Sequence, residues 1–153
     1  MERLLISACL LGVSCKYSGG SNALAPKILA ALRERFTLVP VCPETAGGLP
    51  VPRTPSERRG GRVIARDGED VTAAFEKGAE TALGLARRFG CERALLKENS
   101  PSCGSGRIYD GSFSGRLIPG DGLTAEKLKE AGLTLYGEGR VKELISGKRI
   151  DIN

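Results

Sequence analysis

Residues 70–97 read DVTAAFEKGAETALGLARRFGCERALLK. Apolar side chains recur there every three or four positions, as on one face of an α-helix, at Val71, Ala74, Phe75, Ala79, Ala82, Leu83 and Ala86. The spacing predicts a helix over 71–89, with Asp70 at its N-terminal cap and Gly90 closing it. The apolar run at 93–97 then predicts a buried strand. A helix that leads directly into such a strand is typical of a layered α/β domain.

Other segments alternate in the same way on both sides of this stretch. We expect strands at 3–7, 37–41, 62–66 and 133–137, helices at 24–36, 124–131 and 140–147, a small hairpin or an irregular excursion within 107–118, and loops at 12–22, 42–61 and 98–106. Thr124 is expected to cap its helix, and residues 53–61 read as a mobile, basic part of their loop. This order favours a mostly parallel sheet covered by helices on both faces, a Rossmann-like three-layer sandwich. The length fits one compact stand-alone domain, residues 1–153.

Charge and composition exclude several classes of protein. The net charge of +5 is spread along the chain, and the sparse aromatic residues (5%) are not interleaved with basic ones. We therefore expect no nucleic-acid polymer as partner, and a small anionic ligand fits the charge better. No apolar run approaches the roughly 20 residues of a membrane span. The segment before Cys9 is shorter than the apolar core of about 7–15 residues in a signal peptide, so we expect a cytoplasmic protein.

The five cysteines are informative because the chain contains no histidine. Cys9 and Cys42 each follow a predicted strand, and Cys103 lies in the loop after a third. The carboxyl ends of parallel strands share one edge of a sheet, where such folds bind ligands. Cys15 lies in the first of these loops and can reach the same place. Cys91 precedes a strand, at the opposite end, and is expected to be a buried structural thiol.

Converging thiolates would bind zinc, copper(I) or an iron–sulfur cluster. The chain lacks cysteines two to four residues apart, the spacing of zinc knuckles, so the site would be built on a preformed fold. The alternative is that these cysteines are core or surface thiols without a shared role.

Groups that can transfer protons lie in the same loops. Glu44 follows Cys42 by two residues, Ser100 and Ser102 precede Cys103, and Lys97 comes just before them. Without histidine, proton transfer must fall to side chains of these types. The alternative is that Glu44 caps a backbone amide and the serines make turns.

The sequence around these residues resembles the thiouracil desulfurase family, bacterial and archaeal proteins long known only as a domain of unknown function. The similar blocks are SACLLGVSCKYSGG (7–20), VCPETAGGLPVPRTPSE (41–57), DVTAAFEKGAE (70–80), ALLKENSPSCGSGRIYDGSFSG (94–115) and GDGLTAEKLKEAGL (120–133). The resemblance implies a compact α/β domain with a [4Fe–4S] cluster held by only three cysteines. It also implies removal of sulfur from thiouracil without redox chemistry.

Residue by residue, the resemblance implies cluster ligands among Cys9, Cys15, Cys42 and Cys103. We favour the first, third and fourth of these as the metal ligands. Glu44 corresponds to the family's catalytic glutamate, and Ser102, ahead of Ser100, to its catalytic serine.

The substrate implied is a thiolated pyrimidine base, nucleoside or nucleotide. An open iron would polarise its C–S bond, a water activated by Glu44 would attack the ring carbon, and the serine would hydrogen-bond to the developing charge. Arg53, Arg58 or Arg59 could contact a substrate phosphate, and Lys97 is a further substrate-binding candidate. The alternative for the arginines is a solvated loop.

Two other functions would use the same cysteines. One is a zinc-binding module without catalysis, and the other is a redox sensor that forms a disulfide between Cys9 and Cys15. For the desulfurase reading we expect a small thiolated nucleobase, nucleoside or nucleotide as partner and no membrane, with a homodimer as the candidate assembly.

Overall fold

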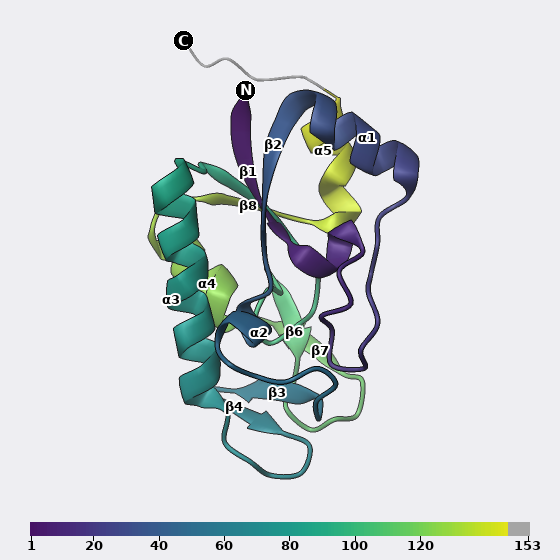
Figure 1. Cartoon of the computed structure of the whole chain (residues 1–153). Helices are drawn as coiled ribbons and strands as arrows, with labels where there is room; N and C mark the ends of the chain where they lie inside the picture. The colour runs from purple at the N-terminus through teal and green to yellow at the C-terminus, as the bar shows by residue number, and fades with distance from the viewer. Residues whose placement is uncertain (147–153) are drawn as a thin grey trace.

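The computed structural model describes residues 1–146 and is built around a four-stranded parallel sheet with strand order β2-β1-β5-β8 (Figure 1). These strands are β1 (Glu2–Ser7), β2 (Phe36–Val41), β5 (Arg93–Leu96) and β8 (Thr134–Gly137). Pro40 lies in the edge strand β2, where a missing backbone N–H is tolerated, as expected. The predicted parallel α/β fold is therefore confirmed.

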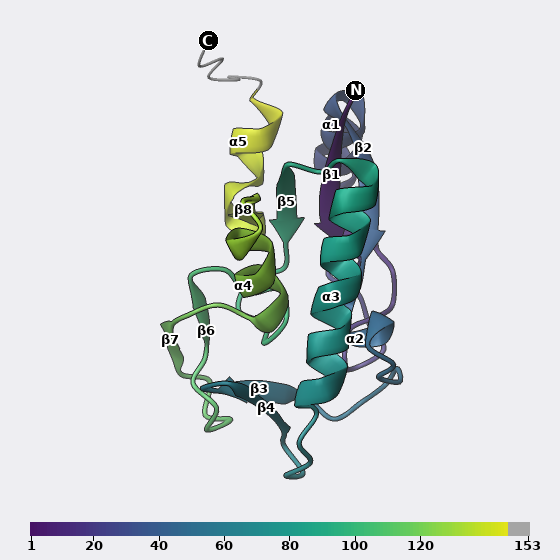
Figure 2. The same cartoon turned by 90° about the vertical axis from the view of Figure 1, so that its left-hand side faces the viewer.

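Helices cover both faces of the sheet, as Figure 2 shows. Alternate residues of β1 and β5 face opposite cores: Leu5 packs with α3 (Thr72–Phe89) and α4 (Leu123–Glu130), while Leu4 packs with α1 (Pro26–Arg35) and α5 (Val141–Ile145). The expected helix at 140–147 is thus observed from Val141, and its position 147 lies outside the described residues. Among the helices of residues 1–146, none combines the length and apolarity that a bilayer crossing requires.

Two small antiparallel hairpins extend the molecule beyond the carboxyl ends of the parallel strands (Figure 1). One pairs β3 (Ser56–Arg59) with β4 (Arg62–Ala65), and the other pairs β6 (Arg107–Tyr109) with β7 (Leu117–Pro119). The second is the hairpin that the sequence predicts. Together with the short elements η1 (Ala8–Leu11), α2 (Pro43–Ala46) and η2 (Glu138–Arg140), they surround the sheet edge where the cysteines were expected.

The expectation of a continuous loop over 42–61 is wrong, because this segment contains α2 and β3. The basic part of it is fixed by long-range hydrogen bonds. Arg58 Nη1 donates to the carbonyl of Asp121 (2.7 Å) and Arg59 Nε to that of Gly111 (2.7 Å).

Thr124 does not cap its helix, contrary to expectation. Gly122 is the N-cap residue, and Thr124 is fully buried, with its Oγ1 lacking a hydrogen-bond partner among the described residues. A Cβ on Gly122 would lie 2.5 Å from the backbone of Ser102, so the start of α4 packs directly against the turn that carries that serine. The helix thereby supports the cysteine-bearing edge.

Candidate active site

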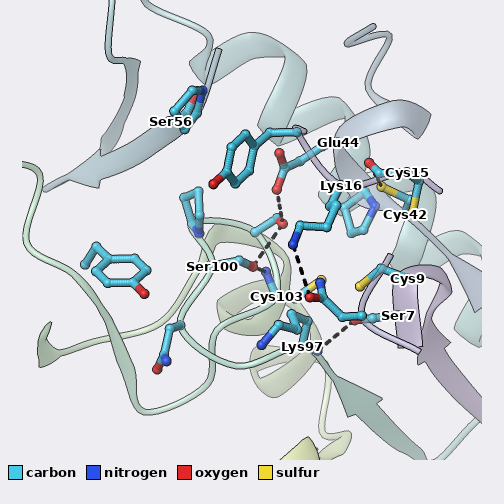
Figure 3. A pocket seen from close by; sticks show the side chains of 18 of the residues that line it. Ser7, Cys9, Cys15, Lys16, Cys42, Glu44, Ser56, Lys97, Ser100 and Cys103 are labelled. Carbon is cyan, nitrogen blue, oxygen red and sulfur yellow. Dashed lines mark hydrogen bonds between the residues drawn. The ribbon is translucent and has the colours of Figure 1, made fainter. Parts of the chain in front are cut away.

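A cavity of about 440 Å³ lies at the carboxyl ends of β1, β2 and β5 and extends to the hairpins. Figure 3 shows the side chains of Cys9, Cys15, Cys42 and Cys103 toward one side of it, and Ser56 of β3 well away from them. The structure therefore brings together the four cysteines that the sequence places at this edge. Cys91 does not line the cavity and packs in the core beside α3, as expected.

Each cysteine is positioned by the end of an element. Cys9 lies in η1 directly after β1, Cys42 lies between β2 and α2 as the N-cap residue of the helix, and Cys103 closes a tight turn after β5. Cys15 and Cys42 lie side by side, with the Cys42 thiol 3.8 Å from the carbonyl oxygen of Cys15 (Figure 3). All five cysteines of the chain are free thiols.

Burial favours the protonated form of three of the thiols at the cavity, Cys9, Cys15 and Cys103. Desolvation raises the pKa of Cys103 to about 12, and desolvation together with the neighbouring Cys42 raises the pKa of Cys15 to about 12. Desolvation also raises the pKa of Cys9. Metal binding at this edge must therefore release protons.

The donor set fits a polynuclear cluster better than a single ion. Four thiols line this cavity, and thiolates favour zinc, copper(I) or iron–sulfur centres. Within residues 1–146, no three cysteine or carboxylate side chains are grouped closely enough to hold one metal ion. The sulfurs instead border a cavity, which is the arrangement that a larger group requires.

A chain of hydrogen bonds links Glu44 to the Cys103 turn. Ser102, only 2% exposed, donates from Oγ to Glu44 Oε2 at 2.8 Å, and Ser100 Oγ lies 3.3 Å from Ser102 Oγ (Figure 3). The backbone N–H of Cys103 in turn donates to Ser100 Oγ at 2.7 Å. The three predicted catalytic residues thus form one network beside a candidate metal ligand.

Arg53 holds the other side of Glu44. Its Nε donates to Glu44 Oε1 (3.1 Å), Nη2 to the carbonyl of Cys15 (2.9 Å) and Nη1 to that of Pro50 (3.1 Å). The Arg53 side chain is only 6% exposed. Each of its three nitrogen atoms donates to a protein oxygen, which favours positioning of Glu44 over capture of a phosphate.

The other basic candidates differ in position. Arg58 and Arg59 do not line the cavity, whereas Lys97 does, near Cys9. The Lys97 ammonium pairs with Glu138, the first residue of η2. Sequence reasoning missed further lining residues: Lys16, Tyr17, Asn22, Glu57, Arg66, Tyr109 and Phe113. Several lie in the blocks that resemble the family, but only the fold shows that they face one cavity.

Known proteins of this architecture match nearly the whole chain. A family model described as 2-thiouracil desulfurase matches residues 4–140. The chain is 40% identical over 152 residues to "Uncharacterized protein YbbK" of Bacillus subtilis (strain 168), which covers 93% of this chain and 99% of that protein. A solved structure described as the [4Fe-4S]-dependent thiouracil desulfidase TudS (DUF523Vcz) superposes with a TM-score of 0.90 at 47% identity, covering 94% of this chain and 95% of its own. The predicted resemblance is confirmed: the chain belongs to the 2-thiouracil desulfurase family.

Proposed function

We propose that this protein is an iron–sulfur-dependent desulfurase that hydrolyses the C=S bond of a thiolated pyrimidine. Water supplies the oxygen of the carbonyl product, and the sulfur leaves as hydrogen sulfide, so no electrons are exchanged. The observation that carries the proposal is the Glu44–Ser102 pair, placed beside a thiol-lined cavity. The family and the [4Fe-4S]-dependent TudS structure support the same chemistry.

Cys9, Cys42 and Cys103 would hold a [4Fe–4S] cluster, because each comes from a different strand end at the cavity. Cys15 stays the fourth candidate, since it lies beside Cys42. A cluster bound by three thiolates supplies one iron with a free coordination position, which acts as a Lewis acid toward thiocarbonyl sulfur.

Glu44 is the group that moves the proton. One carboxylate oxygen is fixed by Arg53 and the other by Ser102, so the carboxylate has a defined orientation. Glu44 takes a proton from the attacking water and later returns it to the departing sulfur. Ser102 stabilises the carboxylate by donating to it, and Ser100 connects Ser102 to the backbone of Cys103.

A nucleotide is the substrate form that the charge of the cavity favours. Lys16 and Arg66 line the cavity, and neither forms an ion pair within the described residues. These two cations replace Arg53, Arg58 and Arg59 as candidate partners of a phosphate. We therefore expect Lys16→Ala and Arg66→Ala to raise KM for a thiouridine monophosphate more than KM for thiouracil.

Anaerobic reconstitution with iron and sulfide, followed by assays of sulfide release from thiouracil and from thiouridine monophosphate, tests the proposal. We expect Cys42→Ser to lose iron and activity, while Cys91→Ser, which changes a core thiol outside the cavity, keeps both. Glu44→Gln should keep the cluster's absorption and lower kcat by about 10²–10⁴-fold. The control Glu34→Gln, on the exposed face of α1, should leave kcat unchanged.

Three results would contradict the proposal. Full activity in Glu44→Gln would exclude Glu44 as the general base. Full iron content in Cys42→Ser would exclude Cys42 as a cluster ligand. Colourless, stoichiometrically zinc-loaded protein without turnover would instead identify a zinc-binding module.

A further inference from the structure

Phe113 lines the cavity and has a backbone conformation that bulky residues rarely adopt. Its φ angle is 57°, in the left-handed region, where a side chain with a Cβ is disfavoured. Its backbone N–H donates a hydrogen bond to the side chain of Glu57. Glu57 follows Ser56, which Figure 3 shows well away from the cysteines. Strain of this kind persists only where the surroundings impose it, and it concentrates at functional sites.

The carboxylate of Glu57 holds the backbone on both sides of Ser112. Glu57 is only 8% exposed, and its Oε1 accepts the backbone N–H groups of Gly111 (2.9 Å) and Phe113 (3.1 Å). Arg59 Nε anchors the same loop through the carbonyl of Gly111. The N–H groups of Gly111 and Phe113 thus tie this loop to β3. The backbone of Phe113 cannot change its conformation without breaking its hydrogen bond to Glu57.

Two guanidinium groups also lie over the ring of Phe113 and hold it in place. The guanidinium groups of Arg59 and Arg66 lie 6.0 and 5.4 Å from its centroid, within the range of cation–π contacts. Arg66 lines the cavity together with Phe113. A rigid apolar ring and a cation therefore adjoin each other on this side of the cavity.

We infer that Phe113 is a specificity-determining residue that provides the flat wall against which the pyrimidine ring of the substrate lies, and that Glu57 is the positioning residue that holds it there. The inference rests on the proposed function, because a thiocarbonyl group directed at the cysteines must have its ring held from elsewhere in the cavity. Stacking on an aromatic side chain suits a flat heterocycle. Tyr17 and Tyr109 also line the cavity, but they are 47% and 37% exposed.

The first test replaces Phe113 in the reconstituted holoenzyme, with thiouracil as substrate and uracil as a non-reacting ligand in calorimetric titrations. Phe113→Ala and Phe113→Gly should each raise KM and the Kd of uracil about tenfold, the loss expected for one stacking contact, with kcat within twofold of wild type. Phe113→Tyr keeps the ring and should keep both constants. Phe113→Gly should melt at a higher temperature than Phe113→Ala, because glycine adopts a positive φ without strain.

The second test separates positioning from simple stability. Glu57→Gln keeps a carbonyl oxygen that can accept both amides, so its KM should stay near wild type, whereas Glu57→Ala should approach the KM of Phe113→Ala. Combining Glu57→Ala with Phe113→Ala should raise KM no further, because both changes remove the same wall. If Glu57→Ala fails to fold, the Phe113 series decides the inference.

The outcomes distinguish the inference from the function beneath it. Wild-type holoenzyme that neither desulfurates thiouracil nor binds uracil would overturn the proposed function and the wall with it. If wild type turns over thiouracil and Phe113→Ala has the same KM and the same Kd of uracil as wild type, the role of Phe113 is contradicted while the proposed function stands. A KM in Glu57→Gln as high as in Glu57→Ala would overturn the positioning role of Glu57.

Discussion

Glu44 is a carboxylate whose two oxygens have different partners. Oε2 accepts from a serine in the Cys103 turn, and Oε1 accepts from an arginine that also binds the loops of Cys15 and Pro50. The orientation of the proposed base therefore depends on one guanidinium group together with one serine hydroxyl. A lysine, with one compact ammonium, cannot bond to all three acceptors in the same geometry.

Removing Arg53 should cost both stability and turnover. Arg53→Ala leaves the partly buried Glu44 and two carbonyl groups without their donor, so we expect the free energy of unfolding to fall by about 3 kcal/mol. We expect kcat to fall at least about tenfold, as misplacement of a catalytic group does. Arg53→Lys should lie between wild type and Arg53→Ala. Urea denaturation and steady-state kinetics measure the two effects.

The matched control is Arg140→Ala. Arg140 pairs with Glu143 on the surface, where its side chain is 57% exposed, so its loss should change the unfolding free energy by less than about 1 kcal/mol. Equal effects of the two arginine substitutions would contradict the positioning role of Arg53.

At the scale of elements, α2 depends on α3. A helix of four residues is not stable alone, so the one that carries Glu44 must be held by its neighbour. The two backbones touch: a Cβ on Gly78 of α3 would lie 1.8 Å from the carbonyl oxygen of Pro43, and one on Gly47 would lie 1.9 Å from that of Ala74. Glycine is required at both positions by this approach.

Two substitutions in α3 should therefore have opposite effects. Gly78→Ala should lower the free energy of unfolding by about 1–3 kcal/mol, the usual cost of overpacking, and should lower kcat because α2 is displaced. Gly84→Ala makes the same chemical change where a Cβ meets nothing within 4 Å, and should stabilise the protein by about 0.5–1 kcal/mol. Thermal melts and kinetics of both variants check this, and stabilisation by Gly78→Ala would refute the close approach.

The start of α3 should make stability depend on acid pH. Hydrogen bonds from Thr72, aided by Arg62, lower the pKa of Asp70 to about 2. An unfolded aspartate has a pKa of about 3.9, so the stabilisation is present above about pH 4 and is lost as the pH falls toward 2. In urea titrations at pH 6, 4 and 2, wild type should therefore lose its stability advantage over Asp70→Asn on acidification. A difference that does not change with pH would contradict this role of Asp70.

Across the whole molecule, the sequence predicts what depends on local patterns. The apolar runs at β1, β2, β5 and β8 and the periodicity of α3 indicate the parallel sheet. The positions of Cys9, Cys42 and Cys103 after strands predict the convergence of these three cysteines. The strand β3 was missed because its SERR sequence has no apolar alternation. It is held by pairing with β4 and by acceptors from distant loops, such as the carbonyls of Gly111 and Asp121. The role of Arg53 was missed for the same reason, since its acceptors lie at residues 15, 44 and 50.

Contacts between residues far apart in the sequence also predict how cofactor binding affects the stability of the whole fold. The proposed ligands Cys9, Cys42 and Cys103 lie on loops after three neighbouring strands, so a group bound to all three ties the sheet edge together only in the folded state. A ligand that binds the folded state alone stabilises it. Under anaerobic conditions, the cluster-loaded protein should therefore melt at a higher temperature than the cluster-free protein. This difference should disappear in Cys42→Ser and persist in Cys91→Ser, because Cys91 packs in the core away from the cavity. Equal melting temperatures for loaded and cluster-free wild type would mean that the thiols do not link the three loops through a shared group.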